Sequence, residues 1–196
     1  ELEMIGRVGN RRRVTMLFSD IRGFTAFSET REPEEVVEML NAYLQVQSEV
    51  VMKHGGDIDK FVGDELMARF DGVGQEARAI QAGVEMIEAV VRLNLQRGPG
   101  ADAVAVGVGV NAGDVIVGAM GAEKRMDYTV IGDAVNLAAR LCSAAGPGEV
   151  IVSAATVETC VPLEGLEIES MKPIQVKGKA KAIPICQARR APTSTT

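Results

Sequence analysis

Two aspartates interrupt apolar stretches of the chain. Asp20 ends the run "VTMLFSD", and Asp64 lies in the Gly63–Asp64 turn that divides "DKFVGDELMARF" into two arms of a hairpin. If these strands are neighbours, as consecutive strands often are, two carboxylates meet at one edge of a sheet. A divalent cation relieves their repulsion, and an all-oxygen site suits Mg²⁺ or Mn²⁺. A solvated acid at a strand end is the alternative interpretation.

A glycine follows the first of these acids. Gly23, in "SDIRGFT", permits a tight turn whose amide groups point into one concavity. Such a turn ahead of a helix is a place for phosphate oxygens. A simple capping turn is the alternative.

Asn136 and Arg140 are four residues apart on an expected helix and therefore share a face. An amide beside a guanidinium can hold a sugar oxygen and a phosphoryl group. Three lysines could add positive charge, because Lys60 lies four residues before Asp64 and Lys177 and Lys179 flank a glycine. Taken singly, each of these residues is equally an ordinary surface residue.

The elements that would position these residues mix hairpins with helices. In the first half of the chain we expect a strand over 14–20, a helix from Pro33 to Gly55, a hairpin around Gly63–Asp64 and a helix over 76–98. Two strands in 103–118 around a turn at 111–114 should follow, and then a strand over 126–133 and a helix over 134–146 capped by Asp133. The last elements should be a strand over 149–153, a short helix over 154–160 and a strand pair around 176–179. This order predicts an α+β (mixed α/β) fold with a largely antiparallel central sheet flanked by helices.

The composition is that of a globular protein, with 46% hydrophobic and 24% charged residues among 196. A net charge of −6 argues against a nucleic-acid binder. No apolar run reaches the roughly 18 residues of a membrane span, and no signal peptide is visible. The three cysteines form no CxxC motif, so we expect a cytoplasmic protein with reduced, mostly buried thiols. We expect one domain over 13–188, a linker over 1–12 that follows an upstream region, and a disordered tail over 189–196.

Familiar nucleotide and hydrolase motifs are absent or misplaced. "GVGVNA" matches GxGxxA in letters, but it runs along a strand into a turn, so we do not interpret it as a dinucleotide site. The sequence contains neither GxxxxGK[ST] nor GxSxG. His54 is the only histidine and is expected at a helix C-terminus, where its charge is favourable. Any chemistry must therefore proceed without histidine.

Taken together, the segments "FSDIRGFT", "DKFVGDELMARF", "DYTVIGDAVNLAAR" and "VKGKAKAIP" strongly resemble the catalytic domain of class III nucleotidyl cyclases, a ferredoxin-like fold. The resemblance covers about Arg13 to Ala188. It implies metal binding by Asp20, Asp64 and the backbone of Ile21, phosphate contacts from Phe24, Thr25 and Lys177, and substrate binding by Gly23 and Arg125. It implies base recognition by Lys60 and Thr129, and transition-state roles for Asn136 and Arg140.

The reaction that this resemblance implies is cyclisation of ATP to 3′,5′-cyclic AMP and pyrophosphate with two Mg²⁺ or Mn²⁺ ions per site. It also implies a homodimer with two interface sites. Many members carry Asp where this chain has Thr129; the Lys–Thr pair is similar to the bicarbonate-responsive subclass. A hydroxyl both accepts and donates, so hydrogen bonding alone leaves GTP open. The alternatives are a guanylate cyclase, a diguanylate cyclase, or an inactive nucleotide-binding module.

Overall fold

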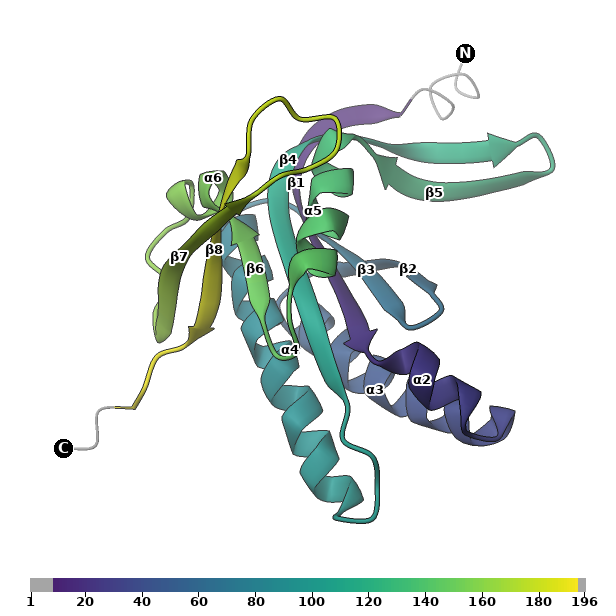
Figure 1. Cartoon of the computed structure of the whole chain (residues 1–196). Coiled ribbons are helices and arrows are strands. Elements are labelled where there is room, and N and C mark those ends of the chain that lie inside the picture. The colour runs from purple at the N-terminus through teal and green to yellow at the C-terminus, as the bar shows by residue number, and fades with distance from the viewer. Residues whose placement is uncertain (1–8, 194–196) are drawn as a thin grey trace.

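The computed structural model describes residues 9–193 of the chain. Its elements are β1 (Asn10–Arg22), α2 (Phe24–Glu29), α3 (Pro33–Lys53), β2 (Asp57–Val62), β3 (Glu65–Phe70), α4 (Gln75–Arg97), β4 (Ala105–Ala122), β5 (Arg125–Ile131), α5 (Asp133–Ala144), β6 (Val150–Ser153), α6 (Ala154–Glu158), β7 (Leu166–Ile174) and β8 (Ile183–Arg190). They build one sheet with helices on both faces (Figure 1).

The strand order in the sheet is β2-β3-β1-β4-β6-β8-β7, and β5 pairs with the far half of β4. Every pairing is antiparallel except that of β4 with β6. The expected α+β fold with a largely antiparallel sheet is therefore confirmed. The central pair is β1 with β4, which stays in register from Asn10–Val117 to Arg22–Ala105.

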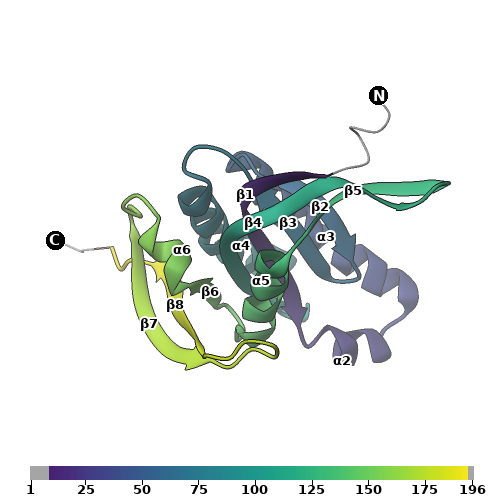
Figure 2. The ribbon, with the colours of Figure 1, turned by 90° about the horizontal axis from the view of Figure 1, so that it is seen from above.

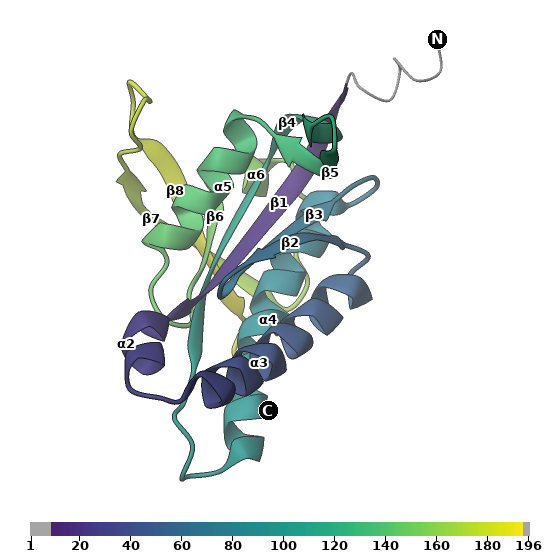
Figure 3. The ribbon, with the colours of Figure 1, turned by 90° about the vertical axis from the view of Figure 1, so that its right-hand side faces the viewer.

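The long helices α3 and α4 cover one face of the sheet, and α5 covers the other (Figure 3). α3 begins with Pro33 in its first turn and a capping box between Glu32 and Glu35. Its apolar stripe, which includes the fully buried Tyr43, packs with α4 and β1 into the larger hydrophobic core. This packing fixes the end of β1 that carries Asp20.

Glycines in β4 allow α5 to lie very close to the sheet. A Cβ atom on Gly109 would lie 2.2 Å from the backbone nitrogen of Cys142 and 2.5 Å from the carbonyl oxygen of Ala138. A Cβ on Gly107 would overlap the Arg22 guanidinium at 2.1 Å. Of the two glycines of "GVGVNA", Gly109 therefore lets α5, the helix that carries Asn136 and Arg140, pack closely, and Gly107 leaves room for the Arg22 side chain.

The expected turn at 111–114 is wrong, because β4 runs unbroken through it. β1 supplies a continuous partner, with Met16 opposite Asn111 and Arg13 opposite Asp114. Asn111 is buried, donates a 2.9 Å hydrogen bond to the carbonyl oxygen of Ala134, and accepts one of 2.7 Å from Ser153. A residue typical of turns is thus an interior polar anchor between β4, α5 and β6.

Three smaller expectations also need correction. Residues 10–12, assigned to the linker, belong to β1, where Arg12 pairs with Val115. Residues 189 and 190, assigned to the tail, belong to β8 and pair with Glu167 and Leu166. Because ladder pairing extends the strands past their apolar runs, composition alone placed both boundaries too far inward. The remainder of the expected linker and tail includes 1–8 and 194–196, which lie outside the described residues.

The third correction concerns the start of α5. Gly132 occupies the N-cap position and no side chain caps the helix, whereas Asp133 is its first residue and pairs instead with Lys179. Asp133 therefore forms a salt bridge with Lys179 in the β7–β8 connection and does not cap the helix.

β5 and the end of β4 form an arm that projects away from the body of the molecule (Figures 1 and 2). Met126, Tyr128 and Ile131 are exposed on this arm, and Phe61 and Val62 are exposed on β2. Over the described residues, no helix is both long and apolar enough to cross a membrane.

Candidate active site

The structure brings Asp20 and Asp64 together at one end of the sheet. β1 and β3 pair up to Ser19 and Leu66, so the end of β1 lies beside the tip of the β2–β3 hairpin. Burial, together with the neighbouring Asp20 carboxyl, raises the pKa of Asp64 to about 7, while the backbone N–H groups of Asp64 and Ile21 partly offset the increase. Two half-buried carboxyl groups and the Ile21 backbone therefore lie next to one another.

This cluster fits a hard divalent cation. Its donors are carboxylate and backbone oxygens, and the two acids destabilise each other when nothing neutralises them. Among residues 9–193, no group of three or more histidine, cysteine, aspartate or glutamate side chains is arranged to hold a metal. The other coordination positions of a bound ion would therefore be left to backbone, water and substrate oxygens.

Sequence reasoning missed two neighbours of this pair. Arg22 lies with its Nη1 atom 3.7 Å from Asp20 Oδ2, and its other end donates to the carbonyl oxygen of Cys142. Burial raises the pKa of Glu65, and the Asp20 charge adds to the increase. Both residues adjoin motif positions, but only the pairing of β1 with β3 and β4 brings them to the acids.

The turn after β1 has the shape expected from the sequence. Gly23 adopts φ +76°, a left-handed conformation that favours glycine, and is the N-cap of α2. A Cβ atom there would meet only open space, so the backbone conformation and not crowding requires the glycine. Phe24 packs against the larger core, and Thr25 is exposed. The turn therefore opens toward solvent beside the acids.

Asn136 and Arg140 share a hollow with Lys177. This cavity of about 520 Å³ lies between α5 and the β7–β8 connection, and Asp133 and Lys179 also line it. Gly178, at φ +86°, makes the turn that carries the two lysines. The amide, the guanidinium and a lysine ammonium thus face one concavity from two elements that are distant in the sequence.

Lys60 and Thr129 are brought together through a residue that sequence reasoning missed, Asp59. The Thr129 hydroxyl donates a 2.8 Å hydrogen bond to Oδ2 of Asp59, and Lys60 Nζ lies 3.6 Å from the same oxygen. Asp59 opens the segment "DKFVGDELMARF", but regular strand alternation places it on the opposite face from Lys60, so the sequence gives it no role in the site.

The remaining candidate, Arg125, lies apart. It pairs with Ala122 at the end of the projecting arm and is exposed. The structure of a single chain does not bring it to the other candidate residues.

The two main groups do not share one hollow within a single chain. The β7–β8 connection runs over the start of α5, whereas β1 ends beside α2 at the far end of the sheet (Figures 1 and 3). Neither Asp20 nor Asp64 lines the hollow of Asn136 and Arg140. Within one chain the pair of acids and the Asn136 hollow therefore remain separate groups.

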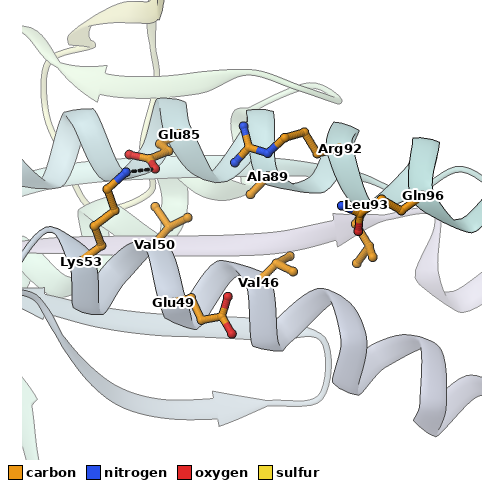
Figure 4. Close-up of a pocket in the computed structure, with 9 residues that line it drawn as sticks. All are labelled: Val46, Glu49, Val50, Lys53, Glu85, Ala89, Arg92, Leu93 and Gln96. Carbon is orange, nitrogen blue, oxygen red and sulfur yellow. Dashed lines mark hydrogen bonds and ion pairs between the residues drawn. The ribbon is translucent and has the colours of Figure 1, made fainter.

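The hollow between α3 and α4, His54 and the cysteines include none of the candidate residues. A hollow between α3 and α4 is lined by Lys53, Glu85 and Arg92 among others, and the Lys53–Glu85 hydrogen bond spans it (Figure 4). His54, as expected, ends α3 and contacts Glu85 at 2.6 Å. The three cysteines are free, and burial raises the pKa of the Cys142 thiol to about 12, so it is no nucleophile.

Comparisons with known proteins agree on the family. The family model described as the adenylate and guanylate cyclase catalytic domain matches residues 8–186. An adenylate cyclase of Anabaena cylindrica is 36% identical over 186 residues, which are 91% of this chain and 37% of that protein. Adenylate cyclase 1 of Rhizobium meliloti (strain 1021) is 34% identical over 187 residues, 92% of this chain and 28% of that protein.

Two solved structures are similar over nearly their whole length. The adenylyl cyclase CyaB from P. aeruginosa superposes with a TM-score of 0.85 at 36% identity, covering 95% of this chain and 98% of that one. The guanylyl cyclase Cya2 superposes with a TM-score of 0.86 at 36% identity, covering 96% and 98%.

The mostly antiparallel sheet flanked by helices is the fold of both of these cyclase structures. The chain belongs to the family of class III adenylate and guanylate cyclase catalytic domains. It spans only about a third of the length of the curated relatives just named.

Proposed function

We propose that this domain is an adenylate cyclase, which converts ATP into 3′,5′-cyclic AMP and pyrophosphate at sites formed between two copies of the chain. In this reaction the ribose O3′ forms a bond to the α-phosphorus, the bond from that phosphorus to the bridging oxygen breaks, and the 3′-OH loses its proton. The observation that carries the choice of ATP is the convergence of Lys60 and Thr129 on Asp59.

Adenine presents an acceptor at ring nitrogen N1 and a donor at its 6-amino group. The Lys60 ammonium can only donate, so it matches N1, and the Thr129 hydroxyl can accept from the amino group. The comparisons do not decide the base, since an adenylyl and a guanylyl cyclase are equally similar to this chain.

Asn136 and Arg140 would act on the reacting atoms. Arg140 carries a permanent charge toward the hollow, where it would stabilise negative charge that develops on the α-phosphate. Asn136, one turn away, would orient the ribose, and Lys177 would bind the phosphate chain. The exposed turn at Gly23–Thr25 would receive the terminal phosphates, and Arg125 would reach them only from the arm of a second copy.

Asp20, Asp64 and the Ile21 backbone would hold two divalent cations, Mg²⁺ or Mn²⁺. When bound, the cations would supply charge neutralisation and a lowered pKa for the attacking hydroxyl. What the chain itself contributes is a pair of acids held close by the β1–β3 pairing.

A homodimer would complete the site. Neither Asp20 nor Asp64 lines the Asn136 hollow, so one chain by itself does not bring the two half-sites together. Both halves occur in this sequence, and a twofold pair of identical chains would then form two equivalent sites. Exposed Phe61, Met126 and Tyr128 give the partner an apolar surface.

The test is the nucleotide product. The protein is incubated at high concentration with ATP or GTP and with Mn²⁺ or Mg²⁺, alongside Asp64→Ala, and products are separated by chromatography. Cyclic AMP that disappears in the variant supports the proposal. Cyclic GMP would establish a guanylate cyclase, and no product from either nucleotide would indicate a nucleotide-binding module. Bicarbonate added to the same assay should raise the rate if the Lys60–Thr129 subclass resemblance extends to regulation.

A further inference from the structure

A β-bulge in β2 turns one acidic side chain into the protein. The register with β3 shifts between Ile58, opposite Ala68, and Lys60, opposite Met67, so Asp59 has no partner of its own. The side chain of Asp57 on the same strand is 74% exposed, whereas that of Asp59 is 4% exposed. A carboxylate this buried requires hydrogen-bond or charge partners.

Both partners of Asp59 are the base-reading candidates. Thr129, which is itself 8% exposed, donates its hydroxyl hydrogen to Asp59 Oδ2 at 2.8 Å. Lys60 Nζ stands 3.6 Å from the same oxygen, while its side chain stays 42% exposed and free to reach a ligand. Asp59 therefore links β2 to β5 at the point where a base would be read.

The direction of the first hydrogen bond has a chemical consequence. A carboxylate oxygen only accepts, and a threonine hydroxyl has a single hydrogen, so the hydrogen of Thr129 is committed to Asp59. Only lone pairs of the hydroxyl remain for a ligand. The hydroxyl can then accept from the 6-amino group of adenine, but it cannot donate to the 6-oxo group of guanine.

We propose that Asp59 is a specificity-determining positioning residue, which fixes the Thr129 hydroxyl as a pure acceptor beside the donor Lys60. This rests on the proposed function, because it assigns Lys60 and Thr129 to the base. Adenine then matches at both its N1 and its 6-amino group. Guanine meets an acceptor opposite its 6-oxo group and a donor opposite its N1–H.

The test is the ratio of kcat/KM for ATP to kcat/KM for GTP. Asp59→Asn keeps the shape, but its amide can donate to the Thr129 oxygen and release the hydroxyl hydrogen toward the base. We expect the ATP:GTP ratio to fall about tenfold, the equivalent of one hydrogen bond, mainly through a gain with GTP. Asp57→Asn, on the same strand with an exposed side chain, should leave the ratio unchanged.

A double-mutant cycle separates this role from simple structural support. In a Thr129→Val background, which retains the shape without the hydroxyl, Asp59→Asn should not change the ratio further. The inference is overturned if Asp59→Asn lowers kcat/KM for ATP and for GTP by the same factor. It is also overturned if the effect of Asp59→Asn on the ATP:GTP ratio persists in the Thr129→Val background.

If the proposed function itself is wrong, the result differs from the two outcomes above that overturn the inference. It would appear as a wild-type protein that makes no cyclic AMP. The inference would then be tested by calorimetric binding of nonhydrolysable ATP and GTP analogues to wild type and Asp59→Asn, where an unchanged ratio of affinities would overturn it. Thermal unfolding of every variant identifies any that fail to fold.

Discussion

The carboxyl groups of Asp20 and Asp64 lie together at the end of β1, although 43 residues separate them: Asp20 lies in β1, and Asp64 lies in the turn between β2 and β3. β3 pairs with β1 up to Ser19 and Leu66, so the folded sheet forces the two acids together. The fold therefore holds two carboxylates close enough to repel each other, and a bound cation would relieve this repulsion.

This relationship predicts that Asp64→Asn stabilises the metal-free protein. Folding raises the pKa of Asp64 from its ordinary value of 3.8 to about 7. Ionisation of this carboxyl therefore destabilises the folded state above pH 7, whereas below pH 3.8 the carboxyl is protonated in both states and has no such effect. With EDTA present, the variant should gain about 1 kcal/mol at pH 8, after allowance for solvent screening, and the gain should vanish as the pH falls toward 4. Denaturant unfolding at both pH values measures it; a variant less stable than wild type at pH 8 contradicts the argument.

The same acids should make Mn²⁺ a stabilising ligand. Mn²⁺ at a concentration well above its dissociation constant should raise the melting temperature of the wild type and leave that of Asp64→Asn unchanged. Differential scanning fluorimetry gives this readout without any turnover. An equal rise in both proteins would place the metal elsewhere.

Two inactive variants should restore activity to each other if the site is shared. Asp64→Ala and Arg140→Ala damage different half-sites, so a mixed dimer keeps one intact site. An equal mixture should recover about a quarter of the wild-type rate, because half of the dimers are mixed and each has one working site. Mixing Asn136→Ala with Arg140→Ala is the control, since both changes fall in one half-site. Recovery in the control, or none in the first mixture, would exclude the shared site.

Gly109→Ala should destabilise the fold and misplace α5. The added Cβ would lie 2.2 Å from the Cys142 backbone nitrogen, and a backbone atom cannot move aside as a side chain does. We expect a loss of about 2 kcal/mol or more in unfolding free energy. Gly100→Ala is the matched control, because a Cβ there meets nothing within 4 Å. Denaturant unfolding that finds the two variants equal would refute the close packing of α5.

Glu85 should contribute stability that depends on pH. The hydrogen bond from Lys53 is the largest effect on Glu85 and lowers its pKa; burial opposes it, and the contact with His54 adds to the lowering. A lowered folded pKa gives stability that is present at neutral pH and is lost as the pH falls below about 4. Glu85→Gln should therefore cost about 0.5 kcal/mol at pH 7 and nothing at pH 3. Glu49→Gln, at the edge of the same hollow but without a contact to Lys53 or His54, is the control variant.

Much of the architecture could be predicted from local patterns. Helix α3 follows from Pro33 and an apolar stripe at helical spacing, and the β2–β3 hairpin from Gly63 between two apolar arms. The same local reasoning failed at Asn111, because Asn favours turns only when no long partner strand holds the chain extended. β1 is such a partner, and only tertiary pairing supplies it.

The candidate site divides in the same way. The sequence by itself determined which residues have the right chemistry, since motif order and spacing identify Asp20, Asp64, Asn136 and Arg140 without coordinates. Only the tertiary structure decided that Asp59 turns inward to meet Thr129 and Lys60, because a one-residue bulge reverses the strand alternation on which sequence patterns depend. It also decided that the acids and the Asn136 hollow lie apart in one chain, since strand order and not sequence spacing sets the distance between residues.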